Sequence, residues 1–306
     1  YFVMLGPLAG AATAGKILGL AEEQLAGALG LAASIQLGGA QYVLSGGHEK
    51  DLSSGHEARR GLLAALVAEK EILGSHDILE GERGIFKAIG TAPGVAGELG
   101  RRWRITECYI KPYPACRYLH ASIEAALNLV REREFNVGDI ERVVVNTNSS
   151  SARRVSYEIK SHVNAIFSHA YQVAAVLRDR RVDLPTAWEE KVRDPLFTGL
   201  MRKVEVRATP EYDQLYRQRS LKQPPWPAEV EVLMRDGKRY RSQVLSPKGD
   251  PTTPLTSVEV REKFTSLAGK VLPKGGPAQV IELVDRLETV PNVSELVGLL
   301  VAARAH

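Results

Sequence analysis

The hydrophobic positions of the first hundred residues recur at the spacing of α-helices. From residue 6 to residue 18, small and apolar side chains run round most of the helix, which predicts a helix packed on several sides. A second helix is expected over residues 20–33, with two glutamates in its first turn facing the positive end of the helix dipole. A third is predicted over residues 55–73, where the apolar positions at helical spacing are Leu62, Leu63, Leu66 and Val67.

The pattern changes to short strands after residue 104. Residues 143–146, 204–207 and 229–234 are predicted strands; the last two show the alternation of half-buried strands. Asp236-Gly237 then precedes a further strand at 240–244, and because these two residues tolerate positive φ, they predict a tight hairpin turn.

Helical spacing returns from Thr256 to the end of the chain, and Ser294 is expected to cap a last helix. The predicted fold class is therefore α+β. A mainly helical domain over residues 1–104 and 253–306 is interrupted by a smaller α/β lid domain over residues 105–252. We expect the functional site between the two, where clefts for small molecules are common.

Composition narrows the classes of partner. The 306 residues are 44% hydrophobic, enough for a substantial core, and 40 basic against 36 acidic side chains leave a net charge of only +4. With 6% aromatic residues, the chain lacks the basic stripe and stacking surfaces of a nucleic-acid binder. A small anionic substrate is the simpler partner.

The cysteines and the hydrophobic stretches of the chain bear on its cellular compartment. Cys108 and Cys116 form no CxxC motif, so neither a disulfide framework nor a zinc site is indicated, and a cytoplasmic setting is expected. The longest uncharged stretch, residues 25–48, is too polar for a membrane span. Since Tyr1 has neither a preceding methionine nor a signal pattern, the chain is expected to begin inside a domain.

The segment that carries most chemistry is Lys111-Pro112-Tyr113-Pro114-Ala115-Cys116-Arg117-Tyr118-Leu119-His120, followed by a helix. Two prolines restrict the backbone before that helix, so Lys111, Arg117 and His120 would be held with little freedom, as in a preorganised anion site. The alternative is a proline-rich entry to a surface helix, with His120 in water or bonded to a backbone carbonyl.

This segment resembles the Lys-Pro-Tyr-Pro-x-Cys-x-x-x-His run of the MmgE/PrpD family, matching it at the lysine, both prolines, the cysteine and the histidine. Four other segments match family patterns in the expected order: Lys50 to Ala58, Leu79 to Gly84, Phe167 to Ala174 and Pro247 to Leu255. The first departs from the family at Ser53, which is commonly histidine, and at Glu57, which is alanine. The small-residue start at Gly6 also matches, so the resemblance covers nearly the whole chain.

The resemblance implies a set of site residues. His120 would transfer the proton, Lys50 would bind a carboxylate or act as an acid, and Tyr171 would donate its hydroxyl to the substrate. We also expect substrate-binding roles for Lys111, Arg117, His56 and Ser168. The alternatives are that Lys50 is a solvated lysine and Tyr171 a core aromatic residue. Family members that resemble this chain form homodimers, and their preceding segment, with an Asp-Asp-x-His run, has no counterpart here.

The implied reaction is that of a metal-independent lyase of small polycarboxylates, most simply a 2-methylcitrate dehydratase. Decarboxylation of cis-aconitate and epimerisation of an iminodisuccinate-like diacid share the same carbanion chemistry and stay open. A truncated, non-catalytic anion-binding or assembly subunit is the rival from another class. No cofactor is expected, because nucleotide-binding motifs are missing, and no metal, because His162 and His169 are not at ligand spacing on one helical face.

Overall fold

The computed structural model describes residues 2–34, 41–90, 98–182, 184, 187–218 and 226–301. The chain divides by its contacts into two compact units. The first comprises residues 1–103, 155–171 and 185–199, and the second comprises residues 104–154, 172–184 and 200–306. The division predicted from the sequence is a different partition and stays a prediction.

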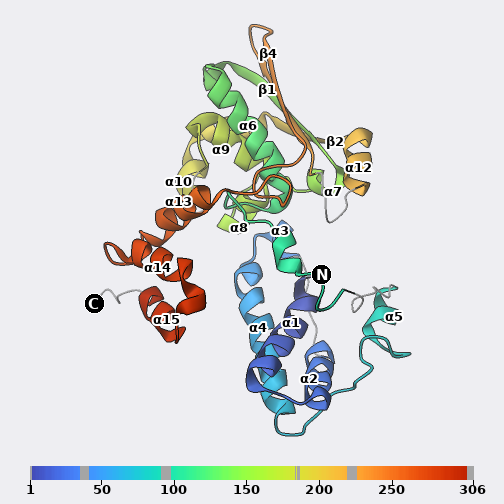
Figure 1. Ribbon diagram of the computed structural model, residues 1–306. Helices are drawn as coiled ribbons and strands as arrows, with labels where there is room; N and C mark the ends of the chain where they lie inside the picture. Colours follow the sequence, from blue (N-terminus) through green and yellow to red (C-terminus); the bar gives the residue numbers. More distant parts are fainter. Residues whose placement is uncertain are drawn as a thin grey trace. The chain divides into compact units, whose positions relative to one another are not determined.

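The first unit is helical. Its helices are α1 (Phe2–Leu18), α2 (Glu22–Ser34), α3 (Tyr42–Ser45), α4 (Glu49–Ala68), α5 (Ile85–Ile89), α8 (His162–Phe167) and α10 (Trp188–Arg193). Figure 1 shows α1, α2 and α4 lying side by side as a small bundle. Helices α9 (His169–Asp179) and α11 (Pro195–Arg202) run from this unit into the second.

Small residues allow α1 and α4 to pack closely. The buried core of the bundle is made of alanines, namely Ala11, Ala28, Ala32, Ala64 and Ala68. Gly61 of α4 lies so near α1 that a Cβ atom there would stand 2.5 Å from the carbonyl oxygen of Pro7. A side chain larger than hydrogen at this point would force the two helices apart.

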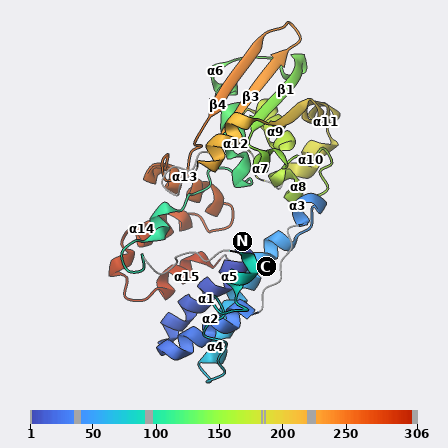
Figure 2. The same cartoon turned by 90° about the vertical axis from the view of Figure 1, so that its right-hand side faces the viewer.

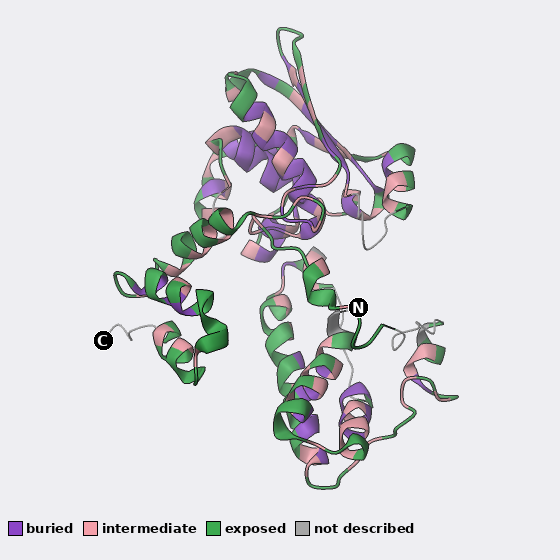
Figure 3. Cartoon of the chain, viewed as in Figure 1, coloured by how far each residue is buried: buried purple, intermediate pink, exposed green. Residues whose placement is uncertain are grey.

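The predicted apolar face of α4 does not form the core. Leu62, Leu63 and Leu66 are 49%, 54% and 42% exposed, whereas the buried positions of the helix are Glu57, Gly61, Ala64, Ala65 and Ala68. The helix also begins and ends earlier than the expected 55–73. The physical reason is close approach: the alanine and glycine side of α4 meets α1, which leaves the leucines on the outer side (Figure 3).

The second unit contains a four-stranded mixed sheet in the order β2-β1-β3-β4. Its strands are β1 (Ile140–Thr147), β2 (Val204–Ala208), β3 (Ala228–Met234) and β4 (Arg239–Val244). Strand β1 pairs parallel to β2 and antiparallel to β3, and β3 pairs antiparallel to β4. The predicted hairpin turn is confirmed, since Gly237 has φ +86° between β3 and β4. Figure 2 shows β1, β3 and β4 broadside.

Helix α6 (His120–Glu132) covers this sheet by packing against β3 and β4. Its buried apolar residues are Ala121, Ile123, Ala125, Ala126, Leu127, Leu129 and Val130, and Figure 3 shows much of this helix as buried. His120, the first residue of α6, is fully buried as well. Helices α7 (Ser149–Ala152) and α12 (Pro210–Arg217) contact the sheet, and the unit also contains the short 3₁₀ segments η1 (Arg104–Glu107), η2 (Arg117–Leu119) and η3 (Val137–Asp139).

The C-terminal part contains α13 (Ser257–Ala268), α14 (Gly276–Asp285), η5 (Leu287–Thr289) and α15 (Ser294–Leu300). Thr256 and Glu259 form a reciprocal capping box at the start of α13. The expected cap at Ser294 is wrong: Ser294 is the first helical residue, and the capping position is Val293, whose side chain cannot accept a hydrogen bond.

The described chain is mainly helical with a small mixed sheet, which confirms the coarse fold class. The insertion of one domain into the other, as a lid, stays a prediction. Across the described residues, no helix combines the length and hydrophobicity needed to cross a membrane.

Candidate functional site

The proline-rich segment leads directly into the N-terminus of α6. Cys116 is extended, at φ −60° and ψ 137°, and the chain then makes the 3₁₀ turn η2 before His120 begins the helix. His120 is fully buried and Arg117 is 4% exposed. The two side chains are therefore held by packing. Of the alternative drawn from the sequence, His120 in water does not describe this structure, whereas His120 bonded to a backbone carbonyl does, through Ala115.

The carbonyl oxygen of Ala115 brings two predicted site residues together. The Nε2 atom of His120 lies 3.3 Å from this oxygen, and the Nζ atom of Lys111 donates to it at 3.2 Å. Because a carbonyl oxygen only accepts, this geometry favours the tautomer with hydrogen on Nε2. The lone pair is then on Nδ1, which is buried and has no hydrogen-bond partner among the described residues.

The surroundings hold His120 in its neutral form. Burial is the main cause that lowers its pKa from 6.5 to about 3, followed by the positive charge of Arg117 and, more weakly, those of Lys111 and Lys263. The contact with the Ala115 carbonyl opposes the shift. Burial and the nearby cations both disfavour the imidazolium form, so His120 stays neutral while no anion is bound beside it.

Arg117 does not point to solvent as a substrate-binding cation would. It forms a buried ion pair with Asp250, whose side chain is 0% exposed, and its guanidinium lies 4.6 Å from the ring centroid of Tyr109. Burial raises the pKa of Asp250, and the contact with Arg117 partly offsets this. The arrangement fixes the loop around residue 250 against the segment that carries His120, while the predicted role of Arg117 in substrate binding stays a prediction.

The other predicted residues belong to the first unit. Lys50 lies in the first turn of α4, with Nζ 3.9 Å from a carboxylate oxygen of Asp51, and His56 is exposed on the same helix. Ser168 is fully buried and its hydroxyl donates to the carbonyl of Ser156 at 2.8 Å.

Tyr171 packs in the core of this unit. It is 4% exposed, and its ring meets that of Phe197 edge-on at 5.3 Å. Its backbone N–H donates to the hydroxyl of Ser168 at 3.3 Å. The structure thus brings together Ser168 with Tyr171 in one unit, and Lys111, Arg117 and His120 in the other.

Sequence reasoning missed the partners that shape the second group. Asp250 lies inside the recognised Pro247 to Leu255 segment, so its position in a motif could have marked it. The Ala115 carbonyl and the ring of Tyr109 carry no comparable signal, because backbone acceptors and packing partners depend on the fold.

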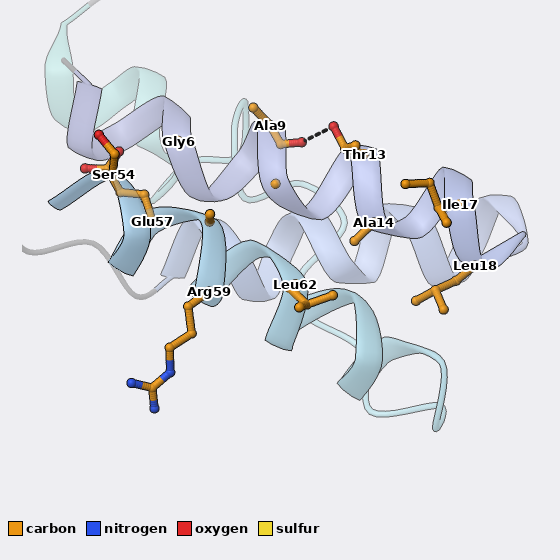
Figure 4. A pocket seen from close by; sticks show the side chains of 12 residues that line it. Gly6, Ala9, Thr13, Ala14, Ile17, Leu18, Ser54, Glu57, Arg59 and Leu62 are labelled. Atoms are coloured by element: carbon orange, nitrogen blue, oxygen red, sulfur yellow. Dashed lines mark hydrogen bonds between the residues drawn. The ribbon is translucent and has the colours of Figure 1, made fainter. Parts of the chain in front are cut away.

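Two hollows, one in each unit, differ in the charge of their lining. A groove of about 620 Å³ runs between α1 and α4 (Figure 4). Its lining is mostly apolar or small: Gly6, Ala9, Gly10, Thr13, Ala14, Ile17, Leu18, Ser54, Glu57, Ala58, Arg59 and Leu62. With Arg59 as the single cation of this lining, the groove does not suit a polycarboxylate.

A second hollow, of about 440 Å³, lies beside the proline-rich segment in the second unit. Its charged lining consists of three cations, Arg131, Lys248 and Lys263, and three acids, Glu124, Glu259 and Glu262. Lys248 is already 3.1 Å from Glu259, and its backbone N–H donates to Glu124 at 2.7 Å. This balance of charge makes the hollow a poor anion site by itself. Tyr113 lines the hollow and also packs on His120, with the two ring centroids 5.3 Å apart.

The sequence matches two family descriptions and a group of curated proteins. Residues 2–97 match the MmgE/PrpD N-terminal domain and residues 113–289 the MmgE/PrpD C-terminal domain. The chain is 28% identical to a cis-aconitate decarboxylase of Aspergillus terreus, over 96% of this chain and 63% of that protein. It is 26% identical to the human cis-aconitate decarboxylase, over 97% of this chain and 62% of that protein. The chain thus spans somewhat less than two thirds of the length of these relatives, and the two domain matches together show that it belongs to the MmgE/PrpD family.

Proposed function

We propose that this chain carries part or all of a lyase site for small polycarboxylates, with His120 as the group that transfers the proton. The observation that supports this most is the state of His120: a buried neutral imidazole, oriented by the Ala115 carbonyl, with an unpartnered Nδ1 among the described residues and cations nearby. Structural histidines usually have both ring nitrogens satisfied, so an unpartnered one suggests that a reacting group belongs there.

The cations that surround His120 suit a substrate with several carboxylates. When such an anion binds, its charge offsets the effect of Arg117 and Lys111 and raises the pKa of His120 towards the range where general acid–base catalysis is efficient. Proton transfer next to a carboxylate builds negative charge on carbon, which nearby cations stabilise. Binding of the anionic substrate would therefore raise the pKa of the same histidine that transfers its proton.

Substrate access to Nδ1 requires the groups that cover His120 to move. Tyr113 is the half-buried aromatic side chain whose ring packs on the imidazole, and burial raises the pKa of its hydroxyl to about 12, so it stays protonated. We propose that Tyr113 swings aside on binding, while Lys50 binds a second carboxylate and Tyr171 donates its hydroxyl. A homodimer is proposed for the complete enzyme.

Among the possible reactions, the names of the relatives favour decarboxylation of cis-aconitate. In that reaction a carbon–carboxylate bond breaks, carbon dioxide leaves, and the electron pair shifts through the double bond to the carbon that takes a proton, here from the His120 imidazolium. Dehydration of 2-methylcitrate is the second candidate, since the family resemblance leaves this reaction open as well. It removes a proton next to a carboxylate and releases the hydroxyl as water.

The test is turnover of cis-aconitate and 2-methylcitrate by the chain, followed by proton NMR of substrate and product. His120→Gln should abolish turnover, and His76→Gln should not, because His76 is an exposed residue outside the proposed set of site residues. Turnover that survives His120→Gln would contradict the proposed role of this histidine.

A non-catalytic anion-binding subunit is the alternative, and it is motivated by the departures from the family pattern at Ser53 and Glu57. Calorimetric titration with citrate separates the two. Binding with no turnover of either substrate would favour the subunit; turnover of either one would exclude it.

A further inference from the structure

We propose that His48, Asp51 and His162 form a Zn²⁺ site with an open coordination position. Each of the three side chains offers one ligand atom, and these atoms lie within 4.8 Å of one another. The proposal concerns residues of the first unit alone and does not depend on the proposed lyase activity. It also departs from the sequence-based expectation of no metal. That expectation rested on histidines of a single helical face, whereas these three ligands come from the starts of α4 and α8.

The distances are near those that a bound zinc ion imposes. The Nε2 atom of His162 is 2.9 Å from Oδ2 of Asp51, and the Nδ1 atom of His48 is 3.4 Å from the same oxygen. With zinc–ligand bonds of about 2.0–2.1 Å, the ligands of a tetrahedral ion stand roughly 3.3 Å apart. Only small rotations are needed, and His48, whose side chain is 68% exposed, is open to make them.

The cluster is held by the fold at both ends. His48 directly precedes α4, Asp51 lies in the first turn of that helix, and His162 is the first residue of α8. The hydroxyl of Ser161 donates to the carbonyl of Gly46 at 2.7 Å in a buried hydrogen bond, which ties the two loops together. The approach is so close that a Cβ at Gly46 would meet Asn164 at 2.3 Å. The loops that carry the two histidines are thus joined by a buried hydrogen bond between Ser161 and Gly46.

The donor set favours a transition-metal ion over calcium or magnesium. Two imidazoles and one carboxylate suit zinc, and the same set also binds iron(II), whereas calcium and magnesium prefer sites made of oxygen. The ring centroids of His48 and His162 are 5.0 Å apart, so both imidazoles can reach one shared ion. Lys50 approaches the other carboxylate oxygen of Asp51, Oδ1, at 3.9 Å, so Oδ2 is left for the metal.

Exposure provides the open position. The side chains of Asp51 and His162 are 38% and 29% exposed, so solvent reaches the cluster and a water molecule can complete the coordination. Three protein ligands with one exchangeable position is the arrangement found where zinc binds an exogenous oxygen.

The experiment uses the untagged chain after treatment with a chelator. Zn²⁺ is titrated in competition with a chromophoric chelator, and Co²⁺ is added separately to record the visible absorption of a tetrahedral site. We expect one Zn²⁺ per chain and the Co²⁺ spectrum. His162→Ala and His48→Ala should each weaken binding by more than the roughly 10–100-fold known for the loss of an outer-shell partner.

His76→Ala is the matched control, because it removes an exposed histidine of the same unit that lies outside the cluster. Its Zn²⁺ affinity should equal that of the unchanged chain. Far-UV circular dichroism checks that each variant is folded, and Asp51→Asn provides a further variant should His162→Ala unfold. No stoichiometric binding by the unchanged chain, or equal affinities in the control and all folded cluster variants, would overturn the proposal.

Discussion

Arg117 and Asp250 form a buried ion pair across a separation of 133 residues. The pair joins the proline-rich segment before α6 to the loop after β4, so the backbone that positions His120 is held from both sides. It also places a positive charge where it lowers the pKa of His120. One contact therefore serves both the architecture and the electrostatics of the candidate site.

Replacement of Asp250 by asparagine should destabilise the second unit severely. The change leaves the charge of Arg117 buried without its partner, which typically costs about 3–5 kcal/mol. Chemical denaturation measures the free energy of unfolding. The double variant Arg117→Met with Asp250→Asn should recover part of the loss, because it removes the uncompensated charge. A loss below about 1 kcal/mol in the single variant would mean that the pair is solvated.

The stability of the chain should depend on pH through His120. Its pKa is 6.5 in the unfolded chain and about 3 in the folded one, so between these values the unfolded state binds the extra proton. Stability from this residue is therefore complete above pH 6.5 and falls by about 1.4 kcal/mol for each pH unit below it.

The comparison with His120→Gln isolates this contribution. The difference in unfolding free energy between the unchanged chain and the variant should shift by about 2 kcal/mol from pH 7 to pH 5. His76→Gln serves as the control, since an exposed histidine should show no comparable shift. If the His120→Gln difference were the same at both pH values, the histidine would not be neutral and buried as described.

Removal of the charge of Lys111 should raise the pKa of His120. Lys111→Gln keeps a donor for the Ala115 carbonyl but removes a cation that disfavours the imidazolium. Imidazole chemical shifts of the folded chain, followed by NMR over a pH titration, report the change. Lys274→Gln removes an exposed lysine that is not among the causes of the shift, and it should leave the titration where it was.

Two glycines of α4 should respond in opposite directions to alanine. At Gly61 the new methyl group would meet backbone atoms of α1 at 2.5–2.7 Å, so Gly61→Ala should cost about 1–3 kcal/mol. At Gly55 nothing lies within 4 Å, and alanine should stabilise the helix by roughly 0.5–1 kcal/mol. Thermal unfolding of both variants tests the helix packing; equal effects would show that α1 and α4 do not meet at Gly61.

The sequence by itself determined the family and those elements whose signals are local. Alternation along residues 229–234 and the Asp236-Gly237 pair were sufficient for the β3–β4 hairpin, because strand periodicity and turn chemistry are local properties. The prolines between Lys111 and His120 likewise predicted a restrained entry into a helix, which the structure has, while anion binding by this segment stays a prediction. Features of this kind depend only on residues that are adjacent in the sequence, so the sequence predicts them.

Only the tertiary structure decided which side chains face inwards and which meet. The leucines of α4 looked like a core stripe, yet glycine and alanine on the other side allow α1 to approach so closely that the leucines lie outside. The pairing of Arg117 with Asp250, and the meeting of His48 with His162, join residues far apart in the chain. Such contacts depend on how whole elements pack. Packing is set by the free energy of the entire unit and cannot be read from a local stretch of sequence.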